Sequence, residues 1–488
     1  MSLAATKPLG SVVGKAPELC RRSATALAAL IRRRQVSSRE VVSAFLDQID
    51  AVNPRYNAIV ALRPRAEVLA EADAADAAIA RGEAVGPLHG LPQAIKDLAL
   101  TKGLTTTFGS PLFADFVPPA DSVSVERIRK AGAIIIGKTN TPEFGLGSHT
   151  YNPVYGATRN AYDPSRTAGG SSGGAAVALA TRMLPVADGS DFGGSLRNPA
   201  AFNNIFGFRP SQGRVPNAPA LESFLSQFGY EGPMAHNVED LALLLSVQAG
   251  YDARAPLSLD GGDHRYAVRL QADPRCRRIA WLGDLGGHLA MEPGILDLCR
   301  QGLSLLGEIG CTVEETVPAF DFEKLWRAFV TLRHLTVGGK LKPLHDDPGK
   351  RALLKPEAQW EIEGGYRLSA YDVYAASETR TAWYATVLKL FETCDYLALP
   401  TAQVFPFPVE EHWPREVAGR HMDSYHRWME VVAPVTLSGC PVISLPVGFD
   451  GRSLPMGMQL VGRPRDDLSV LQLAQAYEQA CPWLAATP

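Results

Sequence analysis

Long apolar runs, a strong charge of one sign and paired cysteines are all missing from this sequence of 488 residues. No apolar run approaches the roughly 20 residues that a membrane-spanning helix needs, and residues 1–8 lack the apolar core of a secretory signal. A formal net charge of −3 gives no basic field for nucleic acid. The 7 cysteines are scattered and never form a CxxC pair, which disfavours a disulfide framework or a zinc site. We therefore expect a soluble, cytoplasmic protein that binds neither membranes nor nucleic acid.

What the sequence does contain is two serine sites flanked by glycine. Residues 169–174 read Gly-Gly-Ser-Ser-Gly-Gly and residues 193–195 read Gly-Gly-Ser, and the alanine-rich segment between them predicts a buried helix. Glycine allows unusual backbone angles and close approach of a substrate, so these serines present a hydroxyl on nearly bare main chain. Backbone N–H groups around Ser195 can then stabilise the oxyanion of an acyl transfer.

These segments carry a resemblance to a known family. Residues 169–180, together with residues 191–197, resemble the signature of the amidase signature family of serine hydrolases, and residues 86–97 resemble the lysine motif of that family. Looser similarity extends from about residue 23 to about residue 478, nearly the whole chain.

The resemblance implies one large α/β domain over residues 1–488, with a mixed, mostly parallel sheet between helices. It places a signature core at about 86–240 and a variable, more helical, substrate-shaping region at about 320–430. The hydrophobic pattern agrees, since it predicts helices near 38–52, 65–81 and 238–248 that alternate with short strands near 93–100 and 278–282.

The resemblance also implies a Ser-Ser-Lys triad. Ser195 would attack the carbonyl, Ser171 would relay its proton, and neutral Lys96 would be the base. A cis peptide bond to Gly170 would hold Ser171 in place. From the residues alone, Lys96 in its short apolar segment is either an ion-paired structural residue or a base whose pKa burial depresses. The oxyanion donors would be the backbone N–H groups of Phe192, Gly193, Gly194 and Ser195.

Further residues of the site follow from the same resemblance. Gly145 and Gly147 would leave room for the acyl group, although an ordinary glycine turn explains them about equally well. Ser172, Asp191 and Arg197 would fix the loops that carry the triad. Phe192 stands where the family usually has a smaller or branched residue, so its ring is expected to shape the pocket. No metal and no cofactor are expected.

The expected function is hydrolysis of a carbon–nitrogen bond in a linear amide through an acyl-enzyme, with aryl or alkyl amides, carbamates or esters as candidate substrates. One alternative is the glutaminase subunit of a tRNA-dependent amidotransferase. Another is an α/β-hydrolase-type esterase, because Gly170–Gly174 fits GxSxG with Ser172 as nucleophile. The third alternative is a binding protein without catalytic activity. The expected partners are a small-molecule amide and, as one option, a second copy of the chain in a homodimer.

Two further patterns carry competing interpretations. Residues 132–139 satisfy the Walker A pattern, but their Ala-Ile-Ile-Ile interior predicts a buried strand and not a phosphate-binding loop. His149 is a tempting general base, yet a single histidine is more often structural. His412, His421 and His426 have no metal-ligand spacing, so we assign them no metal.

Overall fold

The computed structural model describes residues 16–260 and 264–488. Residues 1–8, where we expect no targeting signal, lie outside this range. Within the described residues, the larger sheet has eight strands. In spatial order they are β4 (Ala187–Asp191), β6 (Tyr230–Ala235), β5 (Phe206–Arg209), β12 (Val442–Phe449), β13 (Pro455–Val461), β9 (Tyr396–Pro400), β7 (Arg278–Trp281) and β8 (Thr312–Glu315).

The expected mixed α/β fold is confirmed, but the strands of this sheet are mostly antiparallel. The five pairings from β4 to β9 are antiparallel, and the two that join β9 to β7 and β7 to β8 are parallel. The physical reason lies in the connections. Parallel neighbours need a long crossover, whereas β12 and β13 are joined by the short turn at 450–454.

A second, three-stranded sheet carries the lysine motif. In it β3 (Ile134–Thr139) pairs in parallel with β2 (Pro92–Lys96) and antiparallel with β1 (Ile59–Val60). Strand β2 packs against β4, the edge strand of the larger sheet. The last residue of β2, Lys96, therefore lies beside the strand that leads into Asp191.

Alternate residues of the central strands belong to two different cores. Tyr396 and Ala398 of β9 pack in one buried cluster, while Leu397 and Leu399 pack in another. Because successive side chains of a strand point to opposite faces, the sheet separates these cores. The first core contains residues of α7 (Val238–Gln248), α8 (Ile295–Glu308) and α15 (Asp467–Ala480). The second contains residues of α9 (Phe322–Arg333), α13 (Ala370–Leu390) and α14 (Ala433–Ser438). The sheet is thus sandwiched between helices, as expected.

Capping residues mark the start of several helices, among them the long helices α2 and α13. Ser37 caps α2 in a reciprocal capping box with Glu40, and Ser369 caps α13 in the same way with Asp372. The α-helices are α1 (Ala24–Arg32), α2 (Ser38–Tyr56), α3 (Arg65–Ala80), α4 (Val123–Lys130), α5 (Gly173–Ala180), α6 (Arg197–Phe202), α7 (Val238–Gln248), α8 (Ile295–Glu308), α9 (Phe322–Arg333), α10 (Gly339–His345), α11 (Pro348–Arg351), α12 (Pro356–Tyr366), α13 (Ala370–Leu390), α14 (Ala433–Ser438) and α15 (Asp467–Ala480). A small hairpin pairs β10 (Glu416–Val417) with β11 (Arg420–His421).

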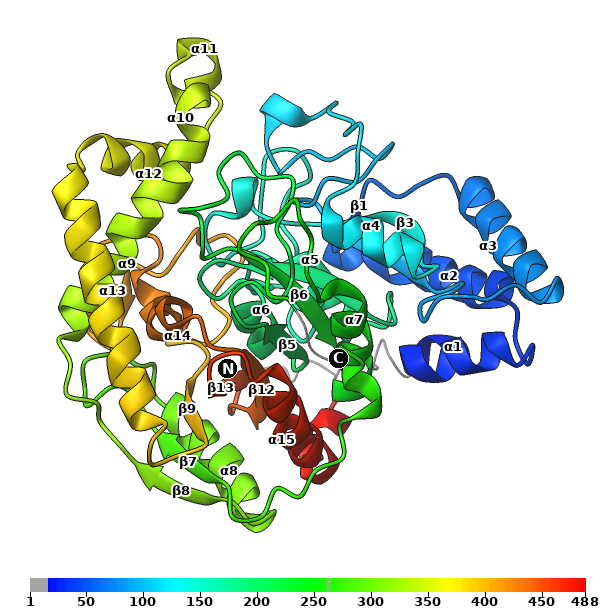
Figure 1. The fold of residues 1–488 in the computed structure, drawn as a ribbon. Helices are drawn as coiled ribbons and strands as arrows, with labels where there is room; N and C mark the ends of the chain where they lie inside the picture. Colours follow the sequence, from blue (N-terminus) through cyan, green and yellow to red (C-terminus); the bar gives the residue numbers. More distant parts are fainter. Residues whose placement is uncertain (1–15, 261–263) are drawn as a thin grey trace, which may run out of the picture.

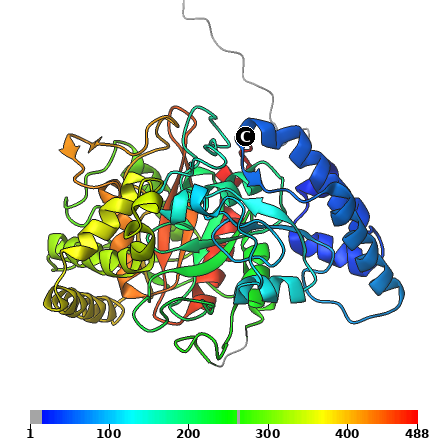
Figure 2. The same ribbon diagram turned by 90° about the horizontal axis from the view of Figure 1, so that it is seen from above.

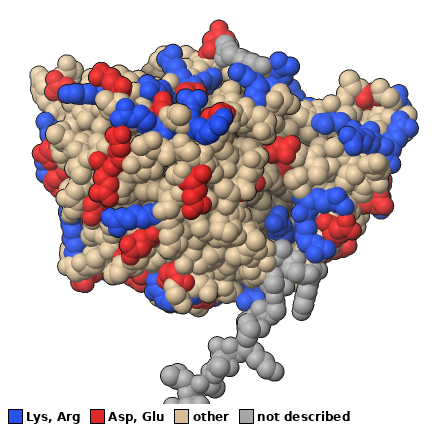
Figure 3. Space-filling view, turned by 90° about the horizontal axis from the view of Figure 1, so that it is seen from below, with Lys and Arg blue, Asp and Glu red and all other residues tan. Residues whose placement is uncertain are grey.

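Figures 1 and 2 show α1 to α3 at one end of the molecule and α9 to α13 at the other, with the sheet between them. On the face in Figure 3, lysine and arginine side chains are interspersed with aspartate and glutamate. Among the described helices, none combines the length and apolar character that crossing a bilayer demands.

Candidate active site

Lys96 ends the buried strand β2 and points its amine at a group of hydroxyls. Its Nζ lies 2.8 Å from the Oγ of Ser171, 2.7 Å from the Oγ of Ser172 and 3.0 Å from the Oγ of Ser190. The residue is 1% exposed. Two of these serines come from the glycine-rich loop before α5 and the third from β4. The structure therefore brings together the lysine motif and the serine signature, which are far apart in the sequence.

The surroundings of Lys96 favour a neutral amine. Burial lowers its pKa from an ordinary 10.5 to about 7, against the opposing influence of nearby carboxylates, of which Asp188 is the strongest. Asp188 accepts the backbone N–H of Lys96 at 3.2 Å through Oδ2, while its Oδ1 has no hydrogen-bond partner among the described residues. Burial also raises the pKa of Asp188 and raises that of Glu231 to about 7. An amine that titrates near neutrality can accept and return a proton there.

The loop that carries Ser171 is tied to the loop that carries Ser195. The bond between Gly170 and Ser171 is cis, and the Gly170 carbonyl accepts the hydroxyl of Ser148 at 2.7 Å. The backbone N–H of Ser172 donates to the carbonyl of Ser195 at 3.2 Å. Both serine segments are thus held at the same place, next to Lys96.

Asp191, the last residue of β4, fixes the loop that presents Ser195. Its carboxylate accepts the N–H of Gly194 at 2.8 Å and that of Leu196 at 3.1 Å. It also pairs with the guanidinium of Arg197 through contacts of 2.9 and 3.0 Å. Although burial opposes ionisation, the charge of Arg197 outweighs it and holds the pKa of Asp191 well below its usual range. The Asp191 carboxylate, paired with Arg197, therefore holds residues 191–197 in a single turn around Ser195.

The backbone N–H groups of this turn differ in one respect from the expected oxyanion donors. The N–H groups of Phe192, Gly193 and Ser195 have no partner within the described part of the chain. The N–H of Gly194 donates to Asp191 instead, so the expectation that it faces a substrate oxygen is wrong. Position 194 requires a residue without a side chain, because its φ is 100° and a Cβ would lie 2.2 Å from the Oδ1 of Asn198.

A cavity of about 220 Å³ opens at these residues, and Lys96, Ser171 and Ser195 all line it. Gly145 and Phe192 line it as expected. A Cβ on Gly145 would lie 3.4 Å from the Oγ of Ser171, so this glycine keeps space beside that hydroxyl. The other expected contacts, Gly147, Gly193 and Gly194, are not part of the lining. A Cβ on Gly147 would meet the ring of Tyr425.

Sequence reasoning missed several groups at the cavity. Asp188 and Ser190 precede Asp191 in β4, and their two-residue spacing puts them on one face of that strand, a signal that was available. Glu231, Arg333 and Lys340 also line the cavity. They come from segments without a local motif, so only the tertiary structure places them there.

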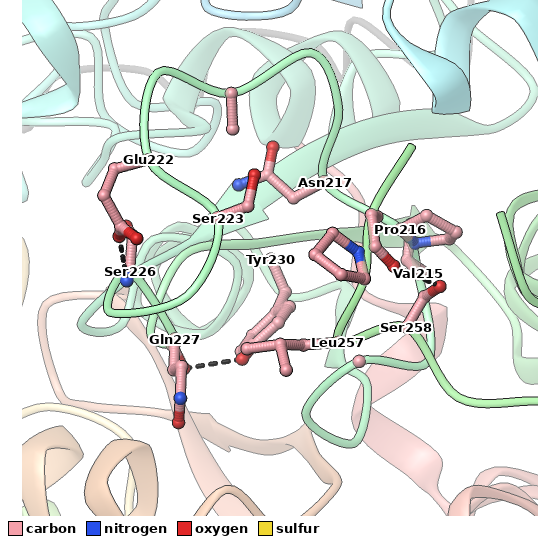
Figure 4. A pocket seen from close by; sticks show the side chains of 14 residues that line it. Val215, Pro216, Asn217, Glu222, Ser223, Ser226, Gln227, Tyr230, Leu257 and Ser258 are labelled. Carbon is pink, nitrogen blue, oxygen red and sulfur yellow. Dashed lines mark hydrogen bonds between the residues drawn. The ribbon is translucent and has the colours of Figure 1, made fainter. Parts of the chain in front are cut away.

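The loop between β5 and β6 forms part of the outer wall. Asn217, Ser226 and Tyr230 line both the large cavity and a smaller one of about 40 Å³, which Figure 4 shows. The hydroxyl of Tyr230 donates to the carbonyl of Gln227 at 2.6 Å, and the carboxylate of Glu222 accepts the N–H of Ser226 at 2.7 Å. These bonds give the wall a defined shape.

The competing motifs have ordinary structural explanations. Residues 134–139, the interior and end of the Walker A pattern, are the buried strand β3, and Lys138 donates to the carbonyl of Ala99 at 2.7 Å. His149 is buried between the carbonyl of Val409 and the hydroxyl of Thr167. Within the described residues, no group of three or more His, Cys, Asp or Glu side chains could hold a metal ion.

Ser172, the nucleophile of the elbow alternative, is fully buried and contacts Lys96. Two of the histidines available to such a triad are engaged elsewhere. His236 contacts the carbonyl of Leu179, and His288 lies 2.8 Å from Glu430.

Comparison with the sequences of known proteins shows the family of this chain. The amidase family model matches residues 40–471. One of the subunits of the glutamyl-tRNA(Gln) amidotransferase of Moorella thermoacetica is 36% identical, covering 96% of this chain and 99% of that protein. The acylamidase of Rhodococcus erythropolis is 34% identical over 96% of this chain and 97% of its own.

Solved structures of similar fold support the same family. A bacterial aryl acylamidase of the amidase signature family superposes with a TM-score of 0.89 at 30% identity, covering 96% of this chain and 99% of its own. A 6-aminohexanoate cyclic dimer hydrolase, solved with its substrate, gives 0.84 at 26% identity, covering 97% and 99%. The chain with Lys96 and the two glycine-flanked serines at one cavity thus belongs to the amidase signature family, whose enzymes act on carbon–nitrogen bonds.

Proposed function

We propose that this protein is an amidase that hydrolyses small linear amides through an acyl-enzyme on Ser195, with Ser171 as proton relay and Lys96 as base. The observation that carries the proposal is the 2.8 Å contact between the Nζ of Lys96 and the Oγ of Ser171 in a cavity that Ser195 also lines. The proposed mechanism also requires a lysine that can be neutral, and burial lowers the pKa of Lys96 to about 7.

In the acylation step, the Oγ of Ser195 attacks the amide carbon as its proton passes to Ser171, whose own proton passes to neutral Lys96. The N–H groups of Phe192, Gly193 and Ser195 are free to stabilise the oxyanion, and one such donor is worth about 2.7 to 4 kcal/mol in other enzymes. When the tetrahedral intermediate collapses, the C–N bond breaks. The leaving nitrogen then takes the proton back from Lys96 through Ser171.

The acyl-enzyme is then an ester on Ser195. Water attacks this ester, and its proton travels along the same relay to Lys96. The C–O bond to Ser195 breaks, the hydroxyl of Ser195 regains a proton, and the carboxylic acid leaves. The positioning residues are Ser172, which holds the amine of Lys96, and the Asp191–Arg197 pair, which holds the turn around Ser195.

The glutaminase component of a tRNA-dependent amidotransferase is the second candidate, because an amidotransferase protein is 36% identical over almost the whole chain. Ammonia release from glutamine, measured with and without the other amidotransferase components, separates the two functions. Hydrolysis of a simple anilide without glutaminase activity supports the amidase, and the reverse result supports the amidotransferase component.

Covalent labelling with a fluorophosphonate tests the nucleophile. We expect wild type and Ser172→Ala to be labelled and Ser195→Ala to remain unlabelled. Labelling that survives in Ser195→Ala and disappears only in Ser172→Ala supports the elbow esterase instead. If neither the wild type nor any variant is labelled, the result supports a binding role.

We further propose that the chemistry belongs to the signature core at about 86–240, while residues 320–430 shape the substrate. Aryl and alkyl amides are the first substrates to test, and esters and carbamates share the same acylation chemistry. The 7 cysteines are all free, which supports a reducing compartment such as the cytoplasm. A homodimer is one assembly to test.

A further inference from the structure

One face of a continuous helix forms a wall of the active-site cavity. Helix α9 runs through a π-helical turn, His334–Gly338, directly into α10. The residues of this segment that line the cavity repeat at helical spacing: Arg333, Thr336, Val337, Lys340 and Leu341. A π-turn inside a helix is frequently found at a functional site. This wall, called the α9–α10 wall below, mixes apolar side chains with two cations.

The first cation, Arg333, is fixed in place but keeps a free donor. Its guanidinium donates from Nε to the carboxylate of Glu361 and from Nη2 to the hydroxyl of Tyr425 at 2.8 Å. Its carbon Cζ lies 4.9 Å from the centre of the Phe192 ring. Within the described chain, Nη1 has no hydrogen-bond partner, although Arg333 lines the cavity. This nitrogen is therefore a positioned donor for a ligand.

The second cation, Lys340, has no partner at all in the described part of the chain, neither a hydrogen bond nor an ion pair. Surrounding protein lowers its pKa, and no carboxylate opposes that effect. The residue as a whole is exposed, so Lys340 borders both the cavity and the solvent. By contrast, Lys342 on the same helix pairs with Asp346.

The position of the α9–α10 wall identifies which part of the substrate it meets. Leu341 packs with Leu146 in one buried cluster, and Val337 and Phe144 pack against that cluster. Gly145 lies between Phe144 and Leu146 in sequence and beside the hydroxyl of Ser171. The wall therefore faces the segment that is expected to hold the acyl group.

Charges of the opposite sign act at another part of the cavity. The carboxylates of Asp188 and Glu231 line it and act on the pKa of Lys96. Arg333 instead pairs with the carboxylate of Glu361 and donates to the hydroxyl of Tyr425, which keeps its proton because burial raises its pKa well above the usual value. Two acids therefore line the cavity next to Lys96, whereas on the acyl side Glu361 balances the charge of Arg333 and Lys340 has no partner among the described residues.

We propose that the preferred substrate is an amide whose acyl part ends in a carboxylate, which binds to Lys340 on the α9–α10 wall, with the Nη1 of Arg333 as a second donor. This inference rests on the proposed amidase function and adds the class of acyl group. The ammonium of Lys340, which has no partner among the described residues, gains one when such a carboxylate binds, and charge-assisted hydrogen bonds are the stronger kind. Apolar Val337 and Leu341 suit the methylene chain between the carboxylate and the amide.

The test uses three anilides that differ only at the end of the acyl chain, which carries a carboxylate, a primary alcohol or an ammonium group. For wild type, we expect kcat/KM for the carboxylate to exceed that for the alcohol by about tenfold or more, the range of one charge-assisted hydrogen bond. Lys340→Met should remove this advantage. The matched control, Lys342→Met on the same helix, should keep it.

A second readout measures binding without turnover. In Ser195→Ala, calorimetry should give a lower Kd for the carboxylate anilide than for the alcohol anilide, and adding Lys340→Met should equalise the two. Equal kcat/KM for carboxylate and alcohol, or a preference for the ammonium substrate, overturns the inference while leaving the amidase function intact. If none of the three anilides is hydrolysed, the proposed function itself fails, and the inference falls with it.

Discussion

The most informative perturbation is a change of pH, because the proposed mechanism needs Lys96 without its proton. Burial lowers the pKa of this lysine from an ordinary 10.5 to about 7. At pH 7 an exposed lysine is neutral in roughly one molecule of 2,500, whereas a lysine with a pKa near 7 is neutral in about half. Burial therefore raises the reactive fraction by roughly a thousandfold.

The expected result is a kcat/KM that falls about tenfold per pH unit well below pH 7 and levels off above it. The assay follows hydrolysis of an uncharged anilide, so that titration of the substrate does not contribute. Lys96→Ala should lower kcat/KM by roughly 100- to 10,000-fold, the usual contribution of a general base, and its residual activity should lack the acid limb. Lys102→Ala, which changes an exposed lysine, is the matched control.

Glu231 needs a separate variant because burial raises its pKa to about 7, within the same range. Its negative charge raises the pKa of Lys96, so Glu231→Gln should keep the acid limb and move it to lower pH. Disappearance of the limb in Glu231→Gln would show that the carboxyl, and not the lysine, titrates. A flat profile from about pH 6 to 8, or a midpoint near that of a free lysine, would refute the reasoning about Lys96.

Two further substitutions probe the loops around the serines. Asp191→Asn removes the carboxylate that pairs with buried Arg197 and should lower the free energy of unfolding by about 3 to 5 kcal/mol in denaturant melts. Asp121→Asn, which affects a partly exposed ion pair, should cost about 1 kcal/mol or less, and equal losses would contradict the role of burial. Gly145→Ala places a Cβ beside the hydroxyl of Ser171, the proposed relay, and should lower kcat/KM more than Gly147→Ala does, although both glycines have positive φ. A larger loss in Gly147→Ala would contradict the assignment of the acyl side.

Much of the fold could be predicted from local patterns. Helix α7 has the boundaries that its hydrophobic spacing indicated, Val238–Gln248, and α2 begins at Ser38, the start of the range predicted for it. The sheet pairing could not be predicted in the same way. A strand's sequence records which faces are buried but not the direction of its neighbour, so the antiparallel centre of the sheet appeared only in the structure.

The candidate site, like the fold, could be predicted only in part from the sequence. The glycine-flanked serines are local features of the chain, whereas the roles of Lys96, Ser171 and Ser195 followed from the resemblance of their segments to the family motifs. Their proximity, and the burial that lowers the pKa of the lysine, depend on strand β2 lying beside β4. The N–H of Gly194, expected at the oxyanion, donates to the carboxylate of Asp191, a contact within the 191–197 segment that the motif did not reveal.

By itself, then, the sequence identified the family and the candidate reacting groups, since these serines, the lysine and the glycines around them lie in contiguous segments. The tertiary structure alone decided what surrounds that chemistry. Arg333 and Lys340 lie more than a hundred residues from the serines and join the cavity because α9 and α10 fold against the 144–146 segment. Substrate selection depends on such distant contacts, because the walls of a cavity come from whichever elements the packing of the core brings together.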